Sequence, residues 1–411
     1  MAADETGLDA LILGGGIAGL WILDALTQRG MSAVVVEPFE LGAGQTLWSQ
    51  GIIHGGTKYS LSGLLSGSAE AIRDMPARWR DCLAGRGRPD LSTAHVRSDH
   101  CYLWQTTGMR SALGMLGARI GLRTAPHAIP EADRPQVLRD CPGTVARLDE
   151  QVVDPASVLA ALAGAHPGRI LKVDSPESIE VQTSPGGGGD IGAVVLRRPG
   201  SGETRVIRPR VLILAAGAGN ESWRIRLGLP AQRSQSRPLH MVLLRGPGDA
   251  LPRLFGHCID GARTRVTITS AEDSRGRTIW QIGGEVAEAG IKFTPEALIA
   301  HARRELAAVL PGLRTESCEW SAYLAPRAEA ATPNGRRPED AVAIREGDVI
   351  TAWPTKLALA PRLAETVAEM LANDKPIGPP SGFLEWPAPE VAPPPWEQER
   401  PWISDLSARS G

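Results

Sequence analysis

Residues 11–20 read LILGGGIAGL, and residues 33–37 read AVVVE. The first stretch is an apolar strand followed by a glycine-rich turn and the start of a helix, and the second is another apolar strand that ends on an acid. This order of strand, glycine turn, helix, strand and acid is the arrangement that binds an ADP-containing dinucleotide. We therefore predict a dinucleotide-binding unit at the beginning of the chain.

Each glycine of the motif has a predicted role. Gly14 permits the tight turn, Gly16 lets the backbone approach a pyrophosphate, and Gly19 lets the helix pack closely on the strand. Ile17 and Ala18 lie at the helix N-terminus, whose N–H groups and partial positive charge favour phosphate.

Glu37 follows at the spacing expected of a carboxylate that accepts hydrogen bonds from both ribose hydroxyls. Such a carboxylate would repel a 2′-phosphate. An NAD-dependent dehydrogenase is an alternative interpretation of this first motif taken alone.

Bulk composition narrows the classes of partner. The chain has 411 residues, with 44 basic and 46 acidic side chains, so its charge balance predicts neither nucleic acid nor an anionic membrane surface as a partner. No apolar run approaches the length of a membrane span, and the acidic N-terminus lacks the features of a signal peptide. The five cysteines form no C-x-x-C pair, which favours reduced thiols in the cytoplasm and predicts no metal site. We expect a small-molecule substrate.

The patterning changes twice along the chain. Residues 211–219 (VLILAAGAG) are typical of a buried parallel strand that ends near a ligand. From residue 233 to 323, short alternating strands and one amphipathic helix predict a mixed sheet. After residue 323 an α/β pattern returns, with a strong helix expected at 359–372.

The last segment, 374–411, is rich in proline and carries Trp386, Trp396 and Trp402. This composition favours extended chain over a packed core. Two interpretations stay open, a strand of peptide on the protein's own surface or a docking segment for a protein partner.

Residues 41–56 read LGAGQTLWSQGIIHGG. This segment resembles the flavin-contacting segment of the D-amino acid oxidase and glycerol-3-phosphate dehydrogenase superfamily. Residues 211–219 resemble the second FAD-contacting strand of that superfamily, and residues 349–361 (VITAWPTKLALAP) resemble its C-terminal flavin-binding turn. The resemblance implies an α/β protein with FAD as cofactor, in which a Rossmann-like FAD-binding domain carries an inserted mixed-sheet α+β substrate domain.

The resemblance also implies which residues contact FAD. Besides the first motif, these residues are Gln45, Thr46, Ser49, Gln50, Gly51, Ile53, Ala216, Gly217, Pro354, Thr355, Lys356 and Leu357. Ser49 stands about where dimethylglycine and sarcosine dehydrogenases carry a flavin-linked histidine, so we expect FAD to be held without a covalent bond.

From the patterning and the resemblance we expect two domains that alternate along the chain. The FAD-binding domain would comprise residues 1–80, 145–232 and 324–373, the substrate domain residues 81–144 and 233–323, and the tail residues 374–411.

Four residues are candidates for the chemistry. The resemblance places Arg327 where family members bind a substrate carboxylate, and Lys356 near the flavin edge that becomes negative on reduction. His54 and His240 are candidate bases for an alcohol substrate, with His257 a weaker third, because histidine titrates near neutral pH. For each of these residues an ordinary structural role is the alternative.

The segments divide between subfamilies. Residues 53–56 (IHGG), residues 282–288 and Lys356 are similar to glycerol-3-phosphate dehydrogenases, whereas 359–361 (LAP) follows the pattern of amine and hydroxy-acid oxidases. Residues 237–241 (RPLHM) replace the Arg-Gly-Gln common in those oxidases, which argues against a simple glycine or sarcosine oxidase.

The implied activity is hydride transfer to flavin N5 from a small anionic amine or alcohol, such as an amino acid, an N-substituted amino acid, a 2-hydroxy acid or a glycerol-phosphate-like compound. The alternative is an FAD-containing structural or accessory subunit of a larger complex.

Overall fold

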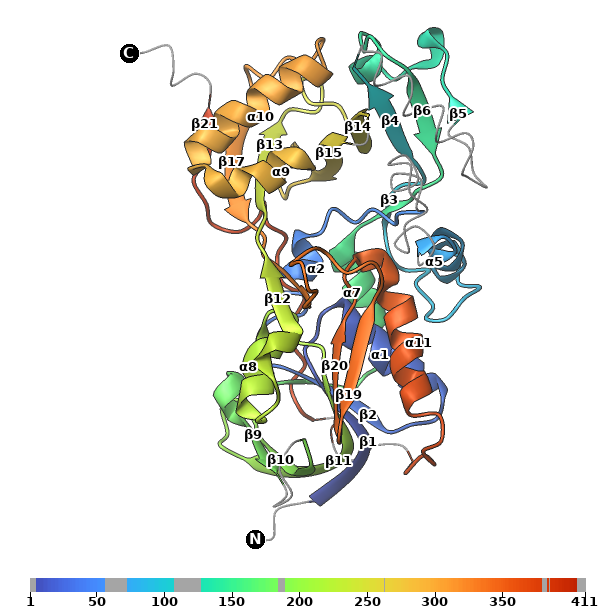
Figure 1. The fold of residues 1–411 in the computed structure, drawn as a ribbon, viewed down its shortest axis with the longest axis vertical. Helices are drawn as coiled ribbons and strands as arrows, with labels where there is room; N and C mark the ends of the chain where they lie inside the picture. The colour runs from blue at the N-terminus through green and yellow to red at the C-terminus, as the bar shows by residue number, and fades with distance from the viewer. Residues whose placement is uncertain are drawn as a thin grey trace.

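The computed structural model describes residues 5–55, 72–106, 127–183, 189–261, 263–378, 383 and 385–404. Gly56, the last residue of the IHGG segment, lies outside this set. The chain forms two lobes along the long axis of the molecule (Figure 1), each built around its own β-sheet. The fold is α/β with mixed sheets.

The first lobe, at the bottom of Figure 1, holds the glycine motif. Its sheet runs in the order β19 (Val342–Glu346), β20 (Val349–Trp353), β11 (Thr204–Leu214), β1 (Glu5–Leu13), β2 (Ala33–Glu37) and β8 (Ile170–Lys172). All these neighbours pair in parallel except β19 and β20. The ends of the central strands nearest the glycine turn, residues 10–13 of β1 and 211–214 of β11, are apolar and buried because a parallel sheet is covered on both faces.

Alternate residues of β1 supply the two faces. Ala10 and Ile12 pack under α1 (Ile17–Gln28), α7 (Pro155–Gly164) and α11 (Ala360–Met370), whereas Leu11 and Leu13 belong to the core on the other side of the sheet. That second core includes α8 (Gly219–Arg226) and Trp386 of the tail. This period of two is the expected behaviour of a strand with both faces buried.

β11 begins at Thr204, before the strand that the sequence predicts within residues 211–219. Its first half pairs antiparallel with β10 (Ile191–Arg197), which pairs in turn with β9 (Ile179–Thr183). Its second half runs between β1 and β20 and ends at the cavity described below.

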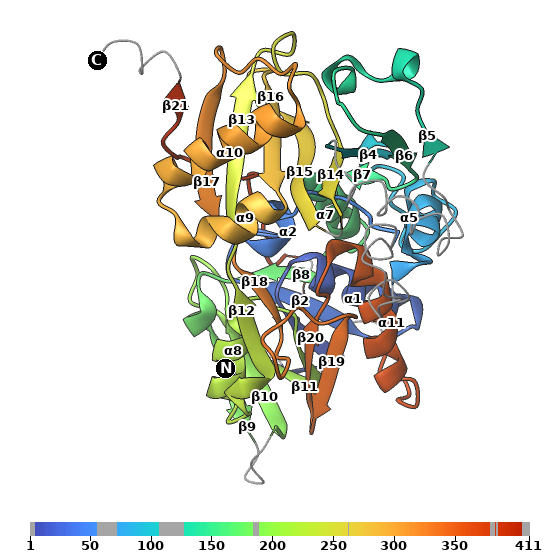
Figure 2. The same cartoon turned by 45° about the horizontal axis from the view of Figure 1, so that its top comes forward.

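The second lobe has a larger sheet. Its order is β21 (Ile403–Ser404), β17 (Glu319–Leu324), β13 (His240–Gly246), β16 (Thr278–Gly283), β15 (Arg263–Glu272), β14 (Gly256–Asp260), β4 (Cys101–Gln105), β6 (Val145–Leu148) and β5 (His127–Ala128). Only the β14–β4 pair is parallel among these described strands. α9 (Glu285–Ala289) and α10 (Pro295–Val309) pack on this sheet (Figure 2).

The structure differs from the expected domain boundaries in two places. β6 pairs with β4 in the second sheet, although residues from 145 onward were expected in the first domain. α5 (Met75–Leu83) crosses the expected boundary at residue 80, and its Trp79 packs against Trp21 of α1 with 4.7 Å between ring centroids. These contacts join residues far apart in sequence, so local patterning does not reveal them.

Short pairs of strands lie between the lobes. The antiparallel pair of β12 (Ser234–Arg237) and β18 (Arg327–Ala330) lies where the chain enters and leaves the second lobe, and a second pair consists of β3 (Val96–Ser98) and β7 (Val152–Val153). The short helix α2 (Gln45–Trp48) also lies between the lobes (Figure 1).

The described part of the tail lies on both lobes. Trp386 Nε1 donates to the Lys172 carbonyl at 2.7 Å in the first lobe. Leu41 then exchanges backbone hydrogen bonds with Glu390 and Ala392, at 2.7 and 3.1 Å. Finally β21 adds to the edge of the second sheet beside β17 (Figure 2). No helix among the described residues has the length and apolar character needed to span a lipid bilayer.

Candidate functional site

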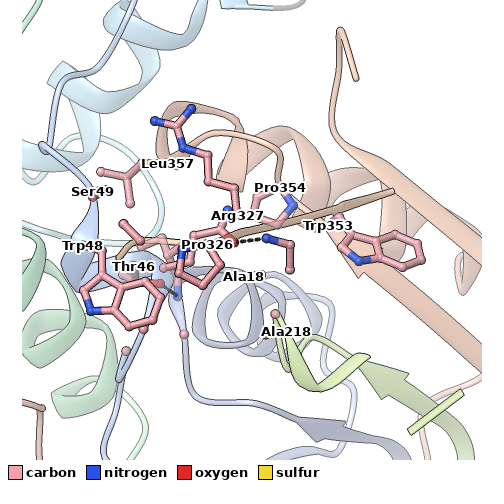
Figure 3. Close-up of a pocket in the computed structure, with 18 of the residues that line it drawn as sticks. Ala18, Thr46, Trp48, Ser49, Ala218, Pro326, Arg327, Trp353, Pro354 and Leu357 are labelled. Carbon is pink, nitrogen blue, oxygen red and sulfur yellow. Dashed lines mark hydrogen bonds between the residues drawn. The ribbon is translucent and has the colours of Figure 1, made fainter. Parts of the chain in front are cut away.

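A cavity of about 440 Å³ lies where the carboxyl ends of β1, β11 and β20 meet α2 and the near edge of the second lobe. Ligands of open α/β sheets bind outside the carboxyl ends of the strands, so this is the expected place for a dinucleotide. Figure 3 shows Arg327 of the cavity wall with Thr46 and Trp48 on one side in this view and Trp353 on the other.

The three motif glycines have separate structural reasons. Gly14 has a φ of +115°, and a Cβ there would lie 2.5 Å from the Ala215 carbonyl oxygen of the neighbouring turn. A Cβ on Gly19 would lie 1.9 Å from the Gly14 oxygen, so Gly19 permits the close approach of α1 to β1. Gly14 and Gly16 line the cavity together with Ile17 and Ala18. Gly19 acts behind them, through packing.

Glu37 is held at the end of β2, on the cavity wall. Its carboxylate accepts hydrogen bonds from the N–H of Gly15 at 2.6 Å and from the N–H of Phe39 at 2.9 Å. Burial raises the pKa of this carboxyl above its ordinary value, and the two N–H donors offset part of that rise. The structure thus presents a fixed acceptor where the motif requires one for a ribose.

Residues 45 to 51 connect the glycine turn with the second lobe. Thr46 Oγ1 accepts from the N–H of Ile17 at 3.2 Å, and Gln45 Oε1 accepts from the N–H of Ala328 at 2.9 Å. Gln50 Nε2 donates to two carbonyls of the second sheet, at 2.9 and 3.1 Å. These three residues, with Ser49 and Gly51, line the cavity.

Ser49 adds an independent observation. Its Oγ is buried, and no residue in the described part of the chain forms a hydrogen bond with it. A buried hydroxyl without a partner is uncommon in a folded protein and indicates a group that a ligand satisfies. Ile53, in contrast, is fully buried away from the cavity, where its N–H donates to the Gln151 carbonyl at 2.8 Å.

Two turns complete the wall. Ala216 and Gly217 follow β11, and residues 354–357 follow β20, all of them lining the cavity. Asn220 ties the two turns together, accepting from the Ala216 N–H at 2.8 Å and donating to the Ala352 carbonyl at 3.1 Å. Thr355 has a φ of +61°, a strained conformation for a β-branched residue of the kind that collects at functional sites.

The residues that line the cavity fit FAD. The glycine turn leaves open backbone where a pyrophosphate would lie, the Glu37 carboxylate stands at the end of the neighbouring strand, and the Ser49 hydroxyl is buried without a partner in the described chain. All three segments border one cavity.

Most of the residues predicted to take part in the chemistry line the cavity. His54, Arg327 and Lys356 line the cavity, and His257 does as well. His240 does not.

His240 belongs to the opposite face of β13. Its neighbours Leu239 and Met241 face the cavity, and successive side chains of a strand point to opposite sides. His240 Nδ1 instead lies 3.1 Å from the Gly290 carbonyl oxygen. The structure therefore removes His240 from the group of residues that could reach a substrate in this cavity.

Other charged residues on the cavity wall did not emerge from the sequence. Arg337 lines it, and so does Glu288, which is exposed at its edge. Both are ordinary charged residues in loops or short helices, and no local pattern distinguishes them.

Glu150 is the buried acid that the sequence did not reveal. Its Oε2 lies 3.3 Å from Nδ1 of His54 and 3.9 Å from Nε2 of His257, and its Oε1 accepts from the Gly55 N–H at 2.8 Å. The His257 Nδ1 lies 2.8 Å from Thr267 Oγ1. The ligand atoms of His54, Glu150 and His257 all lie within 4.8 Å of one another, so the three residues have the types and spacing of metal ligands as well.

Comparison with known proteins gives a consistent result. The family model described as FAD dependent oxidoreductase, DAO, matches residues 9–368. An FAD-dependent oxidoreductase of Pseudomonas aeruginosa is 38% identical over 395 residues, which cover 95% of this chain and 97% of that protein. Its crystal structure superposes with a TM-score of 0.80, at 35% identity, covering 97% of this chain and 99% of that one.

More distant structures share the fold. Glycine oxidase from Geobacillus kaustophilus has a TM-score of 0.59 at 16% identity, covering 91% of this chain and 96% of its own. L-α-glycerophosphate oxidase from Mycoplasma pneumoniae, solved with FAD bound, has a TM-score of 0.61 at 13% identity, covering 97% of this chain and 100% of its own.

Proposed function

Because the chain belongs to the DAO family of FAD-dependent oxidoreductases, we propose that it oxidises a small anionic amine or alcohol in the cavity between the lobes. The enzyme is an FAD-dependent oxidase or dehydrogenase. The substrates that we infer are an amino acid, an N-substituted amino acid, a 2-hydroxy acid or a glycerol-phosphate-like compound.

One observation carries the preference for an anion. Three cationic side chains, Arg327, Arg337 and Lys356, border the same cavity as the FAD-binding segments. An arginine fork suits a carboxylate or phosphate better than an ammonium does, because it donates two parallel hydrogen bonds. We assign the anchoring role to Arg327.

Bound FAD supplies the acceptor for the two electrons and the hydrogen that leave the substrate carbon. The residues of the chain supply the rest. Lys356, in the turn before α11, is assigned to stabilise the negative charge that reduction creates. An alcohol substrate also needs a base for its hydroxyl proton, and we assign that role to His54. An amine needs only to arrive neutral.

The second lobe is assigned as the substrate domain, inserted between segments of the FAD-binding domain. Its contribution to the cavity includes the apolar side chains of Leu239 and Met241 and the glycines Gly283 and Gly284. A Cβ on Gly283 would lie 2.7 Å from the Gln50 side chain, so bulk at this position would push on the segment that lines the cofactor site.

The test of function is anaerobic bleaching of the flavin by a matched panel. Each anion is paired with a counterpart that lacks its carboxylate or phosphate: an amino acid with its amino alcohol, a 2-hydroxy acid with its diol, and glycerol 3-phosphate with glycerol. We expect bleaching by at least one anion and not by its partner. Bleaching by no member would instead favour the accessory subunit, and equal bleaching by both members of a pair would exclude the anion site.

Two variants separate the assigned roles. Arg327→Leu should weaken substrate binding by about 2–5 kcal/mol, the cost of leaving a desolvated charge unpaired. Lys356→Met should lower the reduction potential of the flavin and slow its reduction. If substrate affinity and flavin potential both stayed at their wild-type values, these two assignments would be wrong while FAD binding would stand.

The mode of FAD attachment has its own test. We expect acid precipitation to release the flavin into the supernatant, because Ser49 stands where a flavin-linked histidine would be needed. Colour that stayed with the pellet would show a covalent link.

A further inference from the structure

The group of His54, Glu150 and His257 lies beside the cavity and brings together residues from distant parts of the chain. His54 follows α2, Glu150 follows β6, and His257 lies in β14. The side chains of Glu150 and His257 are 2% and 0% exposed, whereas that of His54 is 19% exposed and borders the cavity. The buried Glu150 carboxylate therefore lies next to His54, which is the more exposed of the two histidines.

The position of the Glu150 carboxylate favours one tautomer of His54. An ionised carboxylate only accepts hydrogen bonds, so the His54 Nδ1 at 3.3 Å from Glu150 Oε2 must be the donor. The Gly55 N–H holds the other oxygen of the same carboxylate at 2.8 Å, which prevents it from rotating away. Nε2 is then the unprotonated nitrogen of a neutral His54.

His257 is less suited to the same role. It is fully buried, its Nε2 lies 3.9 Å from Glu150 Oε2, beyond hydrogen-bond distance, and its Nδ1 lies 2.8 Å from the Thr267 hydroxyl. Its ring lies beside that of His54, with 5.5 Å between centroids. Both imidazoles thus approach the same carboxylate oxygen, and that of His54 is the nearer.

We propose that Glu150 is a positioning residue that holds His54 in the Nδ1–H tautomer and stabilises its protonated form, so that His54 Nε2 takes the hydroxyl proton of an alcohol substrate. This inference rests on the proposed function, and it selects the alcohol among the substrates named there. A buried carboxylate that orients an imidazole acts in this way in other enzymes.

The proton step balances within the chain's own residues. The substrate O–H bond breaks, its electron pair stays on oxygen to form the carbonyl, and the proton forms a new bond to His54 Nε2. FAD, when bound, would accept the hydrogen on carbon together with its electron pair. The pair of His54 and Glu150 changes from a net charge of −1 to zero, so no isolated charge is left buried.

The first test needs no substrate. In holoenzyme labelled with ¹⁵N-histidine, His54 is assigned by the loss of its signals in His54→Gln. We expect the Nδ1–H tautomer above the pKa of His54, and we expect Glu150→Gln to lower that pKa by about 1–3 pH units, because an opposite charge is removed. In the described part of the chain, the titratable neighbours of this group include His257 and the thiol of Cys101, whose own pKa is raised by burial and by Glu150.

Matched variants make the result specific. Asp149→Asn changes an exposed carboxylate next in the chain and should leave the His54 titration unchanged. Glu150→Asp keeps the charge and should restore most of the pKa. An Nε2–H tautomer in the wild type would overturn the proposal, and this result does not depend on how the variant folds. A His54 pKa that does not respond to Glu150→Gln in folded protein would also overturn it.

The second test uses turnover and metal content. With an alcohol found in the panel, Glu150→Gln should slow flavin reduction by about 10²–10⁴-fold while the substrate Kd stays within about 2-fold, as for loss of base catalysis. Stoichiometric metal in the wild type that is lost in Glu150→Gln would show a metal site instead and overturn the proposal. Failure of every alcohol to bleach the flavin would refute the proposed substrate class without touching the histidine spectra.

Discussion

Glu37 combines two opposing effects in one side chain. Its carboxylate is buried, which disfavours charge, yet two backbone N–H groups hold it in the orientation that a ribose would meet. Because the pKa of Glu37 is raised in the folded protein, its contribution to stability is present below the unfolded pKa and is lost as pH rises through the folded pKa.

We predict that Glu37→Gln raises the Kd for FAD by about 10- to 100-fold, since hydrogen bonds to a charged group contribute about 1.5–3 kcal/mol. In the FAD-free protein, the Tm difference between variant and wild type should shift in favour of the variant as pH rises above about 4.3, the ordinary pKa of a glutamate. Flavin fluorescence titration and thermal unfolding measure the two effects. Glu40→Gln, which changes an exposed acid nearby, should show neither.

Gly19 allows close packing of α1 on β1 and does not line the cavity. A methyl group there would overlap the Gly14 oxygen, so α1 would have to move away from β1. We predict that Gly19→Ala lowers the free energy of unfolding by about 1–3 kcal/mol and weakens FAD retention, as overpacking does in cores. Gly7→Ala changes a glycine of β1 that has open space around it, and it should be close to neutral in denaturant unfolding. Equal effects from both substitutions would contradict this role.

At the scale of elements, the sequence was most informative where the signal is local. The glycine turn, Glu37 and the segments 45–51 and 354–357 are each short stretches, and their predicted residues line one cavity except Gly19 and Ile53. Glu150 could not be found in this way, because its role depends on His54, far away along the chain. The alternation around His240 was available in the sequence, since Leu239 and Met241 flank it, and it could have shown which side of β13 faces the cavity.

The described part of the tail contacts Leu41, just before α2, through a backbone bridge. Ala392 donates its N–H to the Leu41 carbonyl at 3.1 Å, and Leu41 directly precedes the loop that leads into α2. We predict that Ala392→Pro, which removes this donor, raises the Kd for FAD while leaving the secondary structure unchanged by circular dichroism. Ala388→Pro alters an exposed position of the same tail and serves as the control. Unchanged FAD affinity in Ala392→Pro would mean that the bridge does not support the loop between Leu41 and α2.

For the molecule as a whole, the cysteines are a measure of folding, because buried thiols lie in both lobes. All five cysteines are free and buried. Burial raises the thiol pKa to about 11 for Cys82 and Cys141 and to about 12 for Cys258, and it raises that of Cys101 as well.

We predict that a thiol reagent at pH 8 modifies the native protein slowly and reaches all five cysteines only after unfolding, because the thiolate is the reactive form. Absorbance of the released chromophore counts the modified thiols, with and without guanidinium chloride. Rapid modification of one thiol in the native state would identify a region that opens without global unfolding.

The order of the strands has a consequence for biosynthesis. Each sheet joins segments from distant points of the chain: β1 must wait for β11 and β20, and the second sheet receives its edge strand β21 only at residues 403–404. During translation, the early glycine motif therefore leaves the ribosome long before its neighbouring strands exist, with its apolar strands uncovered. Neither lobe reaches its full set of strand pairs until most of the chain has been made, so we expect a nascent chain of this protein to depend on chaperones until synthesis ends.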